Sequence, residues 1–179
     1  MSKWYNYIFL FFGLFGFVVS LTILFFAMRA VMDVGGYCAE GGAYQISVHC
    51  PEGVAYLTPL SIFGLLIFGG MYFFNVVPAA FNFGYLFWTA LFGSLGWNFL
   101  DYAVFQSDNI EIAWLICAIL FLLMAFGPFI LLVLVADDMK NYRVGFGKNL
   151  FRKIILFLYQ IMAIALGIWV GAYVFTHLS

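Results

Sequence analysis

The sequence predicts an all-α membrane protein: a bundle of five transmembrane helices with a disulfide-closed extracytoplasmic loop after the first. Its 179 residues are 66% hydrophobic and only 8% charged, whereas soluble domains are about one quarter charged. A helix needs roughly 20 apolar residues to cross a bilayer. Five runs without Asp, Glu, Lys or Arg meet that length, at residues 5–28, 57–77, 80–100, 112–136 and 154–177. Because they fill most of the chain, we expect one membrane domain, residues 1–179.

The first run, residues 5–28, is interpreted as a retained span. It is longer than the ~7–15-residue core of a secretory signal, and no small-x-small cleavage site follows it cleanly. Small residues lie on one face of this run and of the last one, and such faces let helices approach closely in lipid. They are Gly13, Gly16 and Ser20, and Ala163, Gly167 and Gly171. We expect packing inside the bundle; the alternative is docking of another membrane protein.

The few cations set the predicted orientation. Lys3 precedes the first run, and five of the seven cations lie between the fourth and fifth: Lys140, Arg143, Lys148, Arg152 and Lys153. With an odd number of spans, these two groups lie on the same side of the membrane. The positive-inside rule therefore predicts a cytoplasmic N-terminus and an extracytoplasmic C-terminus. The loop of residues 29–56 then faces outward.

The start of this outer loop carries signals for the end of the first helix. Arg29 and Asp33 are four residues apart, a spacing that allows an ion pair on a further helical turn. Gly35-Gly36 then breaks the helix, and Pro51-Glu52-Gly53 is another turn signal before the second run. We therefore expect a folded loop.

Cys38 and Cys50 allow three interpretations. Outside the cytoplasm, such a pair most often forms a structural disulfide, with a stabilisation of about 3 kcal/mol for a short closed loop. An exchangeable pair beside His49 would instead suit a thiol–disulfide oxidoreductase linked to quinone. A zinc site from both cysteines, Glu40 and His49 is the third interpretation, but its spacing matches no common pattern. We favour the structural disulfide, with no metal and no cofactor. Cys117 is interpreted as a packing residue.

The runs at 80–100 and 112–136 carry the remaining polar features. A possible polar face within the membrane comprises Asn82, Thr89, Ser94, Asn98 and Asp101. Interhelical hydrogen bonding and a solute path are both compatible with these residue types. Gly127-Pro128 lies inside the fourth run, where proline removes a backbone donor and usually kinks a helix. The kink could act as a transporter hinge or only shape the bundle.

The segment "VGGYCAEGGAYQISVHCPEGVA", residues 34–55, resembles a signature of uncharacterised small multi-pass bacterial membrane proteins. That signature reads Gly-Gly-x-Cys-Ala-x-Gly-Gly-x-Tyr-x-Ile, followed by Cys-Pro-x-Gly, and Ala43 stands where we associate it with proline. The resemblance implies a bacterial inner-membrane protein with a cysteine-closed outer loop, and it implies no activity. The layout is also similar to that of claudin-like proteins, which is an analogy of architecture alone.

The function predicted from these features is that of a non-catalytic accessory or interaction subunit of a membrane complex. Its expected partners are the lipid bilayer and another membrane protein or a second copy of the chain. The net charge of −1 gives no basis for nucleic-acid binding. The alternatives are the quinone-linked oxidoreductase and a small-solute channel or transporter.

Overall fold

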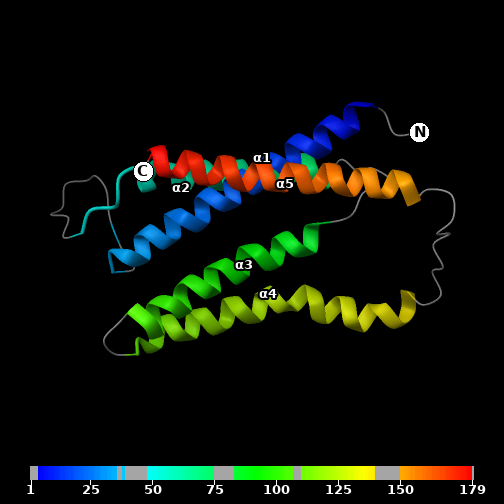
Figure 1. Ribbon diagram of the computed structural model, residues 1–179. Coiled ribbons are helices and arrows are strands. Elements are labelled where there is room, and N and C mark those ends of the chain that lie inside the picture. Colours follow the sequence, from blue (N-terminus) through cyan, green and yellow to red (C-terminus); the bar gives the residue numbers. More distant parts are fainter. Residues whose placement is uncertain are drawn as a thin grey trace. The chain divides into compact units, whose positions relative to one another are not determined.

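The computed structural model describes residues 4–35, 38, 48–74, 83–106, 110–139 and 150–178, and the regular elements within them are helices. A short π-helical turn, η1 (Tyr102–Gln106), directly continues the third of five α-helices (Figure 1). The α-helices are α1 (Trp4–Asp33), α2 (Val54–Phe74), α3 (Gly84–Asp101), α4 (Ile112–Met139) and α5 (Leu150–Leu178). The predictions of an all-α protein and of five helices are confirmed for the described residues.

The first helix runs beyond its predicted apolar stretch. It continues from the expected end at residue 28 to Asp33, where Arg29 Nε lies 3.8 Å from Asp33 Oδ1. Gly35 follows with φ of 105°, a conformation that favours glycine. The predicted extra turn and the glycine break are therefore confirmed, although an exposed ion pair of this kind adds little stability.

Three helical segments are long and apolar enough to cross a membrane: Trp4–Asp33, Val54–Phe74 and Phe151–Leu178. Among the described residues, Ile112–Gly127 forms a shorter apolar stretch. The protein thus has several membrane-compatible helices, as the composition indicated. Crossing by all five helices stays a prediction.

The chain divides into two compact units. Unit 1 comprises residues 1–78 and 159–179, and unit 2 comprises residues 79–158. Helix α5 contributes to both, because the boundary falls within it. This division does not test the prediction of a single membrane domain, which stays a prediction.

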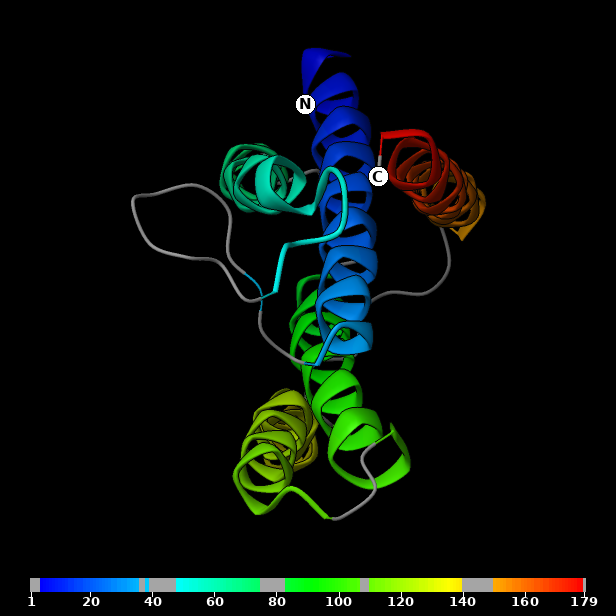
Figure 2. The same cartoon turned by 90° about the vertical axis from the view of Figure 1, so that its left-hand side faces the viewer.

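In unit 1, α1 lies between α2 and α5 (Figure 2). Its contacts with α2 pair Gly13 with Tyr72, Phe17 with Gly69 and Ser20 with Gly64. As one number rises the other falls, so the two helices are antiparallel. The α1 residues in these contacts are three or four apart and therefore share one face.

The contacts between α1 and α5 lie on the other side of α1. They pair Phe11 with Tyr159, Val18 with Gly167, and Phe26 with Phe175. Both numbers rise together, so α1 and α5 are parallel. A helix packed on two opposite faces must be apolar on both, which explains why the first run shows no polar stripe.

In unit 2, α3 and α4 form an antiparallel pair. The ring of Phe99 on α3 stacks on two α4 rings, with centroids 5.3 Å away at Trp114 and 5.4 Å away at Phe121. A Cβ added at Gly96 would lie 3.0 Å from the backbone nitrogen of Leu122, so the two backbones approach closely there.

Candidate functional site

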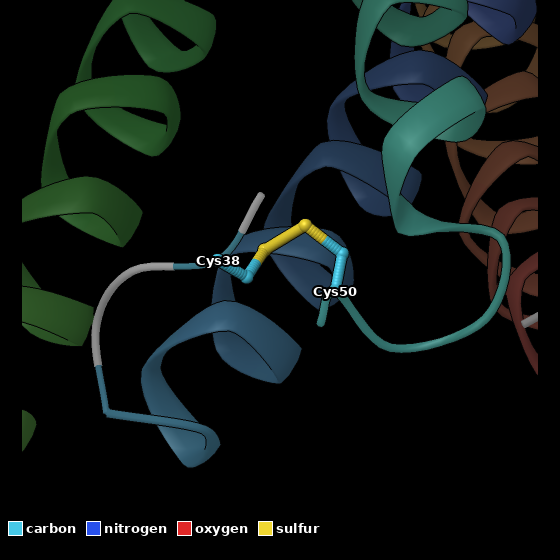
Figure 3. Close-up of a disulfide and its surroundings, with 2 residues drawn as sticks. All are labelled: Cys38 and Cys50. Carbon is cyan, nitrogen blue, oxygen red and sulfur yellow. A yellow bond between two sulfur atoms is a disulfide. The ribbon is translucent and has the colours of Figure 1, made fainter. Parts of the chain in front are cut away.

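The loop between α1 and α2 is closed by a disulfide between Cys38 and Cys50 (Figure 3). The two Cα atoms are 4.8 Å apart, and both cysteines are partly buried. The predicted pairing of these cysteines is confirmed. The residues that separate them in the sequence, 39–47, lie outside the described part of the chain.

A hydrogen-bonded turn ends α1 before Cys38, and another begins α2 after Cys50. After α1, the Gly35 amide donates to the Met32 carbonyl at 3.0 Å. Before α2, the amides of Val54 and Leu57 donate to the carbonyls of Pro51 and Gly53, at 3.1 and 2.8 Å. The disulfide therefore links the chain shortly after the end of α1 to the chain shortly before the start of α2.

A hydrogen bond near the start of α2 connects this helix to α5. The Tyr56 hydroxyl donates to the Leu178 carbonyl at 2.6 Å, which ties the first turn of α2 to the last residue of α5. The carbonyls of a final helical turn have no partner within their helix, so this bond satisfies one of them. This bond was not predicted from the sequence, because no local pattern relates two residues 122 positions apart.

The chemical alternatives for the loop depend on the same residues. Both cysteines are oxidised in the disulfide that joins them, and His49, next to Cys50, is exposed. Glu40, the fourth candidate for a zinc site, lies outside the described residues. Within the part of the chain that the structure describes, no group of three or more His, Cys, Asp or Glu side chains could hold a metal ion.

The predicted polar residues of α3 have different surroundings. Thr89 Oγ1 donates across to the Ala125 carbonyl of α4 at 3.0 Å, whereas Ser94 Oγ donates within its own helix to Leu91 at 2.8 Å. Asn98 is only 1% exposed, and neither atom of its amide has a partner among the described residues. Asn82 lies outside the described residues.

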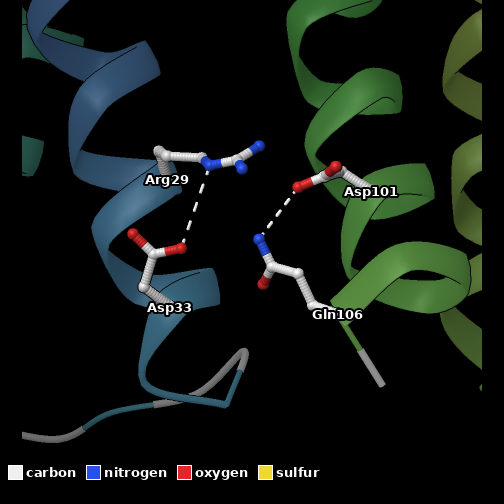
Figure 4. A network of polar contacts seen from close by, with 4 residues as sticks. All are labelled: Arg29, Asp33, Asp101 and Gln106. Atoms are coloured by element: carbon white, nitrogen blue, oxygen red, sulfur yellow. Dashed lines mark hydrogen bonds and ion pairs between the residues drawn. The ribbon is translucent and has the colours of Figure 1, made fainter. Parts of the chain in front are cut away.

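Two polar pairs near helix ends are drawn in Figure 4, each within its own unit. Asp101 Oδ2 accepts a hydrogen bond of 2.8 Å from Gln106 Nε2, so the two side chains connect the end of α3 to the last residue of the π-helical turn η1. The other is the Arg29–Asp33 pair at the end of α1. The predicted polar residues thus take separate structural roles, and a solute path along α3 stays a prediction.

The environment of Pro128 was not foreseen from the sequence. Proline has no amide hydrogen, so the carbonyl four residues earlier, that of Met124, loses its usual helical donor. The indole Nε1–H of Trp88 on α3 donates to this carbonyl at 3.0 Å. Trp88 and Thr89 therefore hold two consecutive carbonyls of α4 just before the proline.

The small residues of α1 contact α2. A Cβ at Gly13 would lie 2.8 Å from the Tyr72 nitrogen, and a Cβ at Gly16 would collide with the Phe68 ring. Ser20 Oγ bonds the Gly16 carbonyl at 2.9 Å and occupies the space beside Gly64. This face is therefore covered within unit 1.

The small residues of α5 contact α1. Added Cβ atoms would lie 2.9 Å from Val18 Cβ at Gly167, and 2.9 Å from the Val19 carbonyl at Gly171. Ala163 is fully buried. Both small-residue faces thus pack helices inside unit 1.

No protein-family model, curated protein or solved structure matches this chain. What the residues define is a helical protein with membrane-compatible helices and a disulfide-closed loop.

Proposed function

We propose that this chain is a non-catalytic integral membrane protein that serves as an accessory or interaction subunit of a membrane complex. In this proposal, all five helices cross the cell (inner) membrane, with a cytoplasmic N-terminus. The disulfide-closed loop is presented on the outer side. The observation that carries the proposal is the covalent closure of that loop directly between two membrane-compatible helices.

The distribution of apolar side chains supports the membrane setting. Large apolar side chains are exposed along α2, such as Phe63 and Leu66, and along α5, such as Leu158. Surfaces of this kind suit lipid contact. Trp4 is also exposed and lies at the start of α1. Tryptophan is enriched at both membrane interfaces.

The parallel arrangement of α1 and α5 supports the predicted topology. Two parallel helices that both cross a bilayer place their starts on one side and their ends on the other. This holds whether α3 and α4 cross as a hairpin or do not cross at all, because an antiparallel pair returns the chain to its starting side. The expected location of the termini on opposite sides therefore does not depend on the number of spans.

The closed loop suits a binding role because its two ends are fixed. A segment that is held in place loses less conformational entropy on binding than a free one, so its affinity for a partner is higher. The small-residue faces of α1 and α5 are used within unit 1. We therefore expect a partner to meet the loop or the outer apolar surfaces.

Affinity purification in mild detergent tests this proposal. We expect the tagged protein to bring down a defined membrane protein at constant stoichiometry. The double variant Cys38→Ser/Cys50→Ser should remain in the membrane and lose most of that partner. Recovery of the native protein only as a partnerless species, after chemical crosslinking in cells, would count against an accessory role.

The quinone-linked thiol–disulfide oxidoreductase is the second candidate. The observation that favours it is that Cys38 and Cys50 already form the disulfide that such an enzyme would use as oxidant, with exposed His49 beside it. A substrate dithiol would pass two electrons to this bond and become a disulfide, leaving two protein thiols. A quinone would then accept two electrons and two protons from these thiols and become a quinol.

The thiol state on intact cells distinguishes the two candidates. A membrane-impermeant maleimide should label Cys38 and Cys50 only after strong reductant if the bond is structural. Ready reduction, followed by reoxidation that requires quinone, would assign the enzyme. Cys50→Ser alone would then abolish substrate oxidation in a protein that still folds.

A further inference from the structure

The geometry around Gly127-Pro128 points to a latched hinge in α4, with Trp88 and Thr89 of α3 as the latch. We propose that α4 bends at this dipeptide, and that the two side-chain hydrogen bonds from α3 hold it in one of its conformations. This inference rests on the proposed crossing of the membrane by α3 and α4, and it does not depend on whether the protein has a partner or an enzymatic activity.

Pro128 leaves one backbone acceptor of α4 without its regular helical donor. In a regular helix, the amide of residue 128 would bond the Met124 carbonyl, and Pro128 cannot supply that amide. The Trp88 indole donates to this same carbonyl at 3.0 Å. Thr89 Oγ1 donates to the next carbonyl, Ala125, also at 3.0 Å. The donors come from consecutive residues of α3 and reach consecutive acceptors of α4.

The packing of α4 changes between the segment before the dipeptide and Gly127 itself. The part of α4 before it is held tightly, since Leu122 lies against Gly96 and Ala125 Cβ lies 3.8 Å from a Cβ position at Gly93. At Gly127, in contrast, an added Cβ would have no heavy atom of the described residues within 4 Å. Helices bend at proline and at small residues such as glycine. Gly127-Pro128 combines both residues directly after a tightly packed segment of α4.

The latch is partly exposed. Trp88 is 47% exposed, so its hydrogen bond lies at the edge of the α3–α4 pair. In a bilayer, no water is present to replace a lost donor, and unsatisfied carbonyls there are recovered by side chains of neighbouring helices. Release of Trp88 would therefore favour a bent α4 in which the Met124 carbonyl finds another donor.

A double-mutant cycle tests the latch. Trp88→Phe removes the donor and keeps an aromatic ring beside Phe92, whereas Pro128→Ala restores the helical amide. Interhelical hydrogen bonds in membranes contribute about 0.6 kcal/mol on average and up to about 1.7. We therefore expect Trp88→Phe to lower the folding equilibrium constant about three- to twentyfold in the native background. In the Pro128→Ala background, it should lower this constant by less than about twofold.

A distance measurement tests the hinge itself. Spin labels on Cys117, which is free, and on an added cysteine from Met139→Cys flank the proline within α4. The labelled protein with native Trp88 and Pro128 should give a narrow distance distribution in lipid nanodiscs. Trp88→Phe should add a shorter population, and Trp88→Phe/Pro128→Ala should remove it again.

Trp97→Phe is the matched control. Trp97 is on the same helix and similarly exposed, at 51%, and the described residues give it no hydrogen bond. It should leave the distance distribution unchanged. Thr89→Val serves as a second latch variant in case Trp88→Phe does not fold, and it should also add the shorter population. An unchanged distribution in the latch variants, or an equal change in the control, would overturn the hinge.

Discussion

Gly13 offers the most direct test of how α1 and α2 pack. A Cβ added at this position would lie 2.8 Å from the backbone nitrogen of Tyr72, 3.1 Å from its Cα and 3.2 Å from the carbonyl carbon of Met71. All three atoms belong to the α2 backbone, so no side-chain rotation can make room. Gly13→Ala can be accommodated only by moving the two helices apart.

The size of the effect follows from two opposing contributions. An ordinary contact begins at 3.4 Å, so the helices must separate by about 0.6 Å, the difference from 2.8 Å, at this point. Overpacking of this kind costs about 1–3 kcal/mol. Alanine is favoured over glycine within a helix by about 1 kcal/mol. The net expectation for Gly13→Ala is therefore a loss of about 0–2 kcal/mol of unfolding free energy.

The matched control is Gly70→Ala in the facing helix. The nearest atoms to a Cβ at Gly70 belong to the Phe74 ring, 3.9 Å away, which is an ordinary contact. This variant should gain about 1 kcal/mol from helix propensity alone. Reversible unfolding in mixed detergent micelles measures both, and the two variants should differ by about 1–3 kcal/mol. Equal stabilisation by both substitutions would refute the close approach of α1 and α2.

Three further substitutions test other parts of the structure. Removing the disulfide with Cys38→Ser/Cys50→Ser should cost about 3 kcal/mol of unfolding free energy. Strong reductant should reproduce this loss in the native protein. No loss of stability in either case would show that the closed loop is not stabilising. Tyr56→Phe should cost about 0.5–1.5 kcal/mol, because the Leu178 carbonyl loses its donor, and faster amide exchange at the end of α5 should accompany it. Asn98→Leu should leave the unfolding free energy unchanged or raise it by about 1–3 kcal/mol. The reason is that it replaces a buried amide that has no partner among the described residues. A clear loss of stability in Asn98→Leu would show that the amide has a partner.

Composition and local patterns were sufficient for the helical architecture and for several helix ends. Uncharged apolar runs place the five helices, and the spacing of Arg29 and Asp33 together with Gly35 locates the end of α1. The disulfide also followed from the sequence, since Cys38 and Cys50 are the two cysteines in one short loop. These features depend on residues that are close together in the chain.

The tertiary structure decided which polar side chains act together. The polar residues of α3 suggested a single face, yet Thr89 bonds α4, Asp101 bonds Gln106 and Asn98 has no partner among the described residues. Likewise, Pro128 suggested a kink, but only the structure identified the donor that serves the carbonyl it leaves free. Helical periodicity gives the direction of a side chain around the axis of its own helix. It does not identify the neighbouring helix that the side chain contacts.

By itself, the sequence determined that this is a helical protein with membrane-compatible helices and a loop closed by two cysteines, because hydropathy and chain proximity are local properties. Only the tertiary structure decided that α1 packs on two opposite faces and that Tyr56 bonds Leu178. The physical reason is that an apolar helix carries no polar stripe to indicate its neighbours. Close packing at glycines and hydrogen bonds over long sequence separations select the arrangement instead.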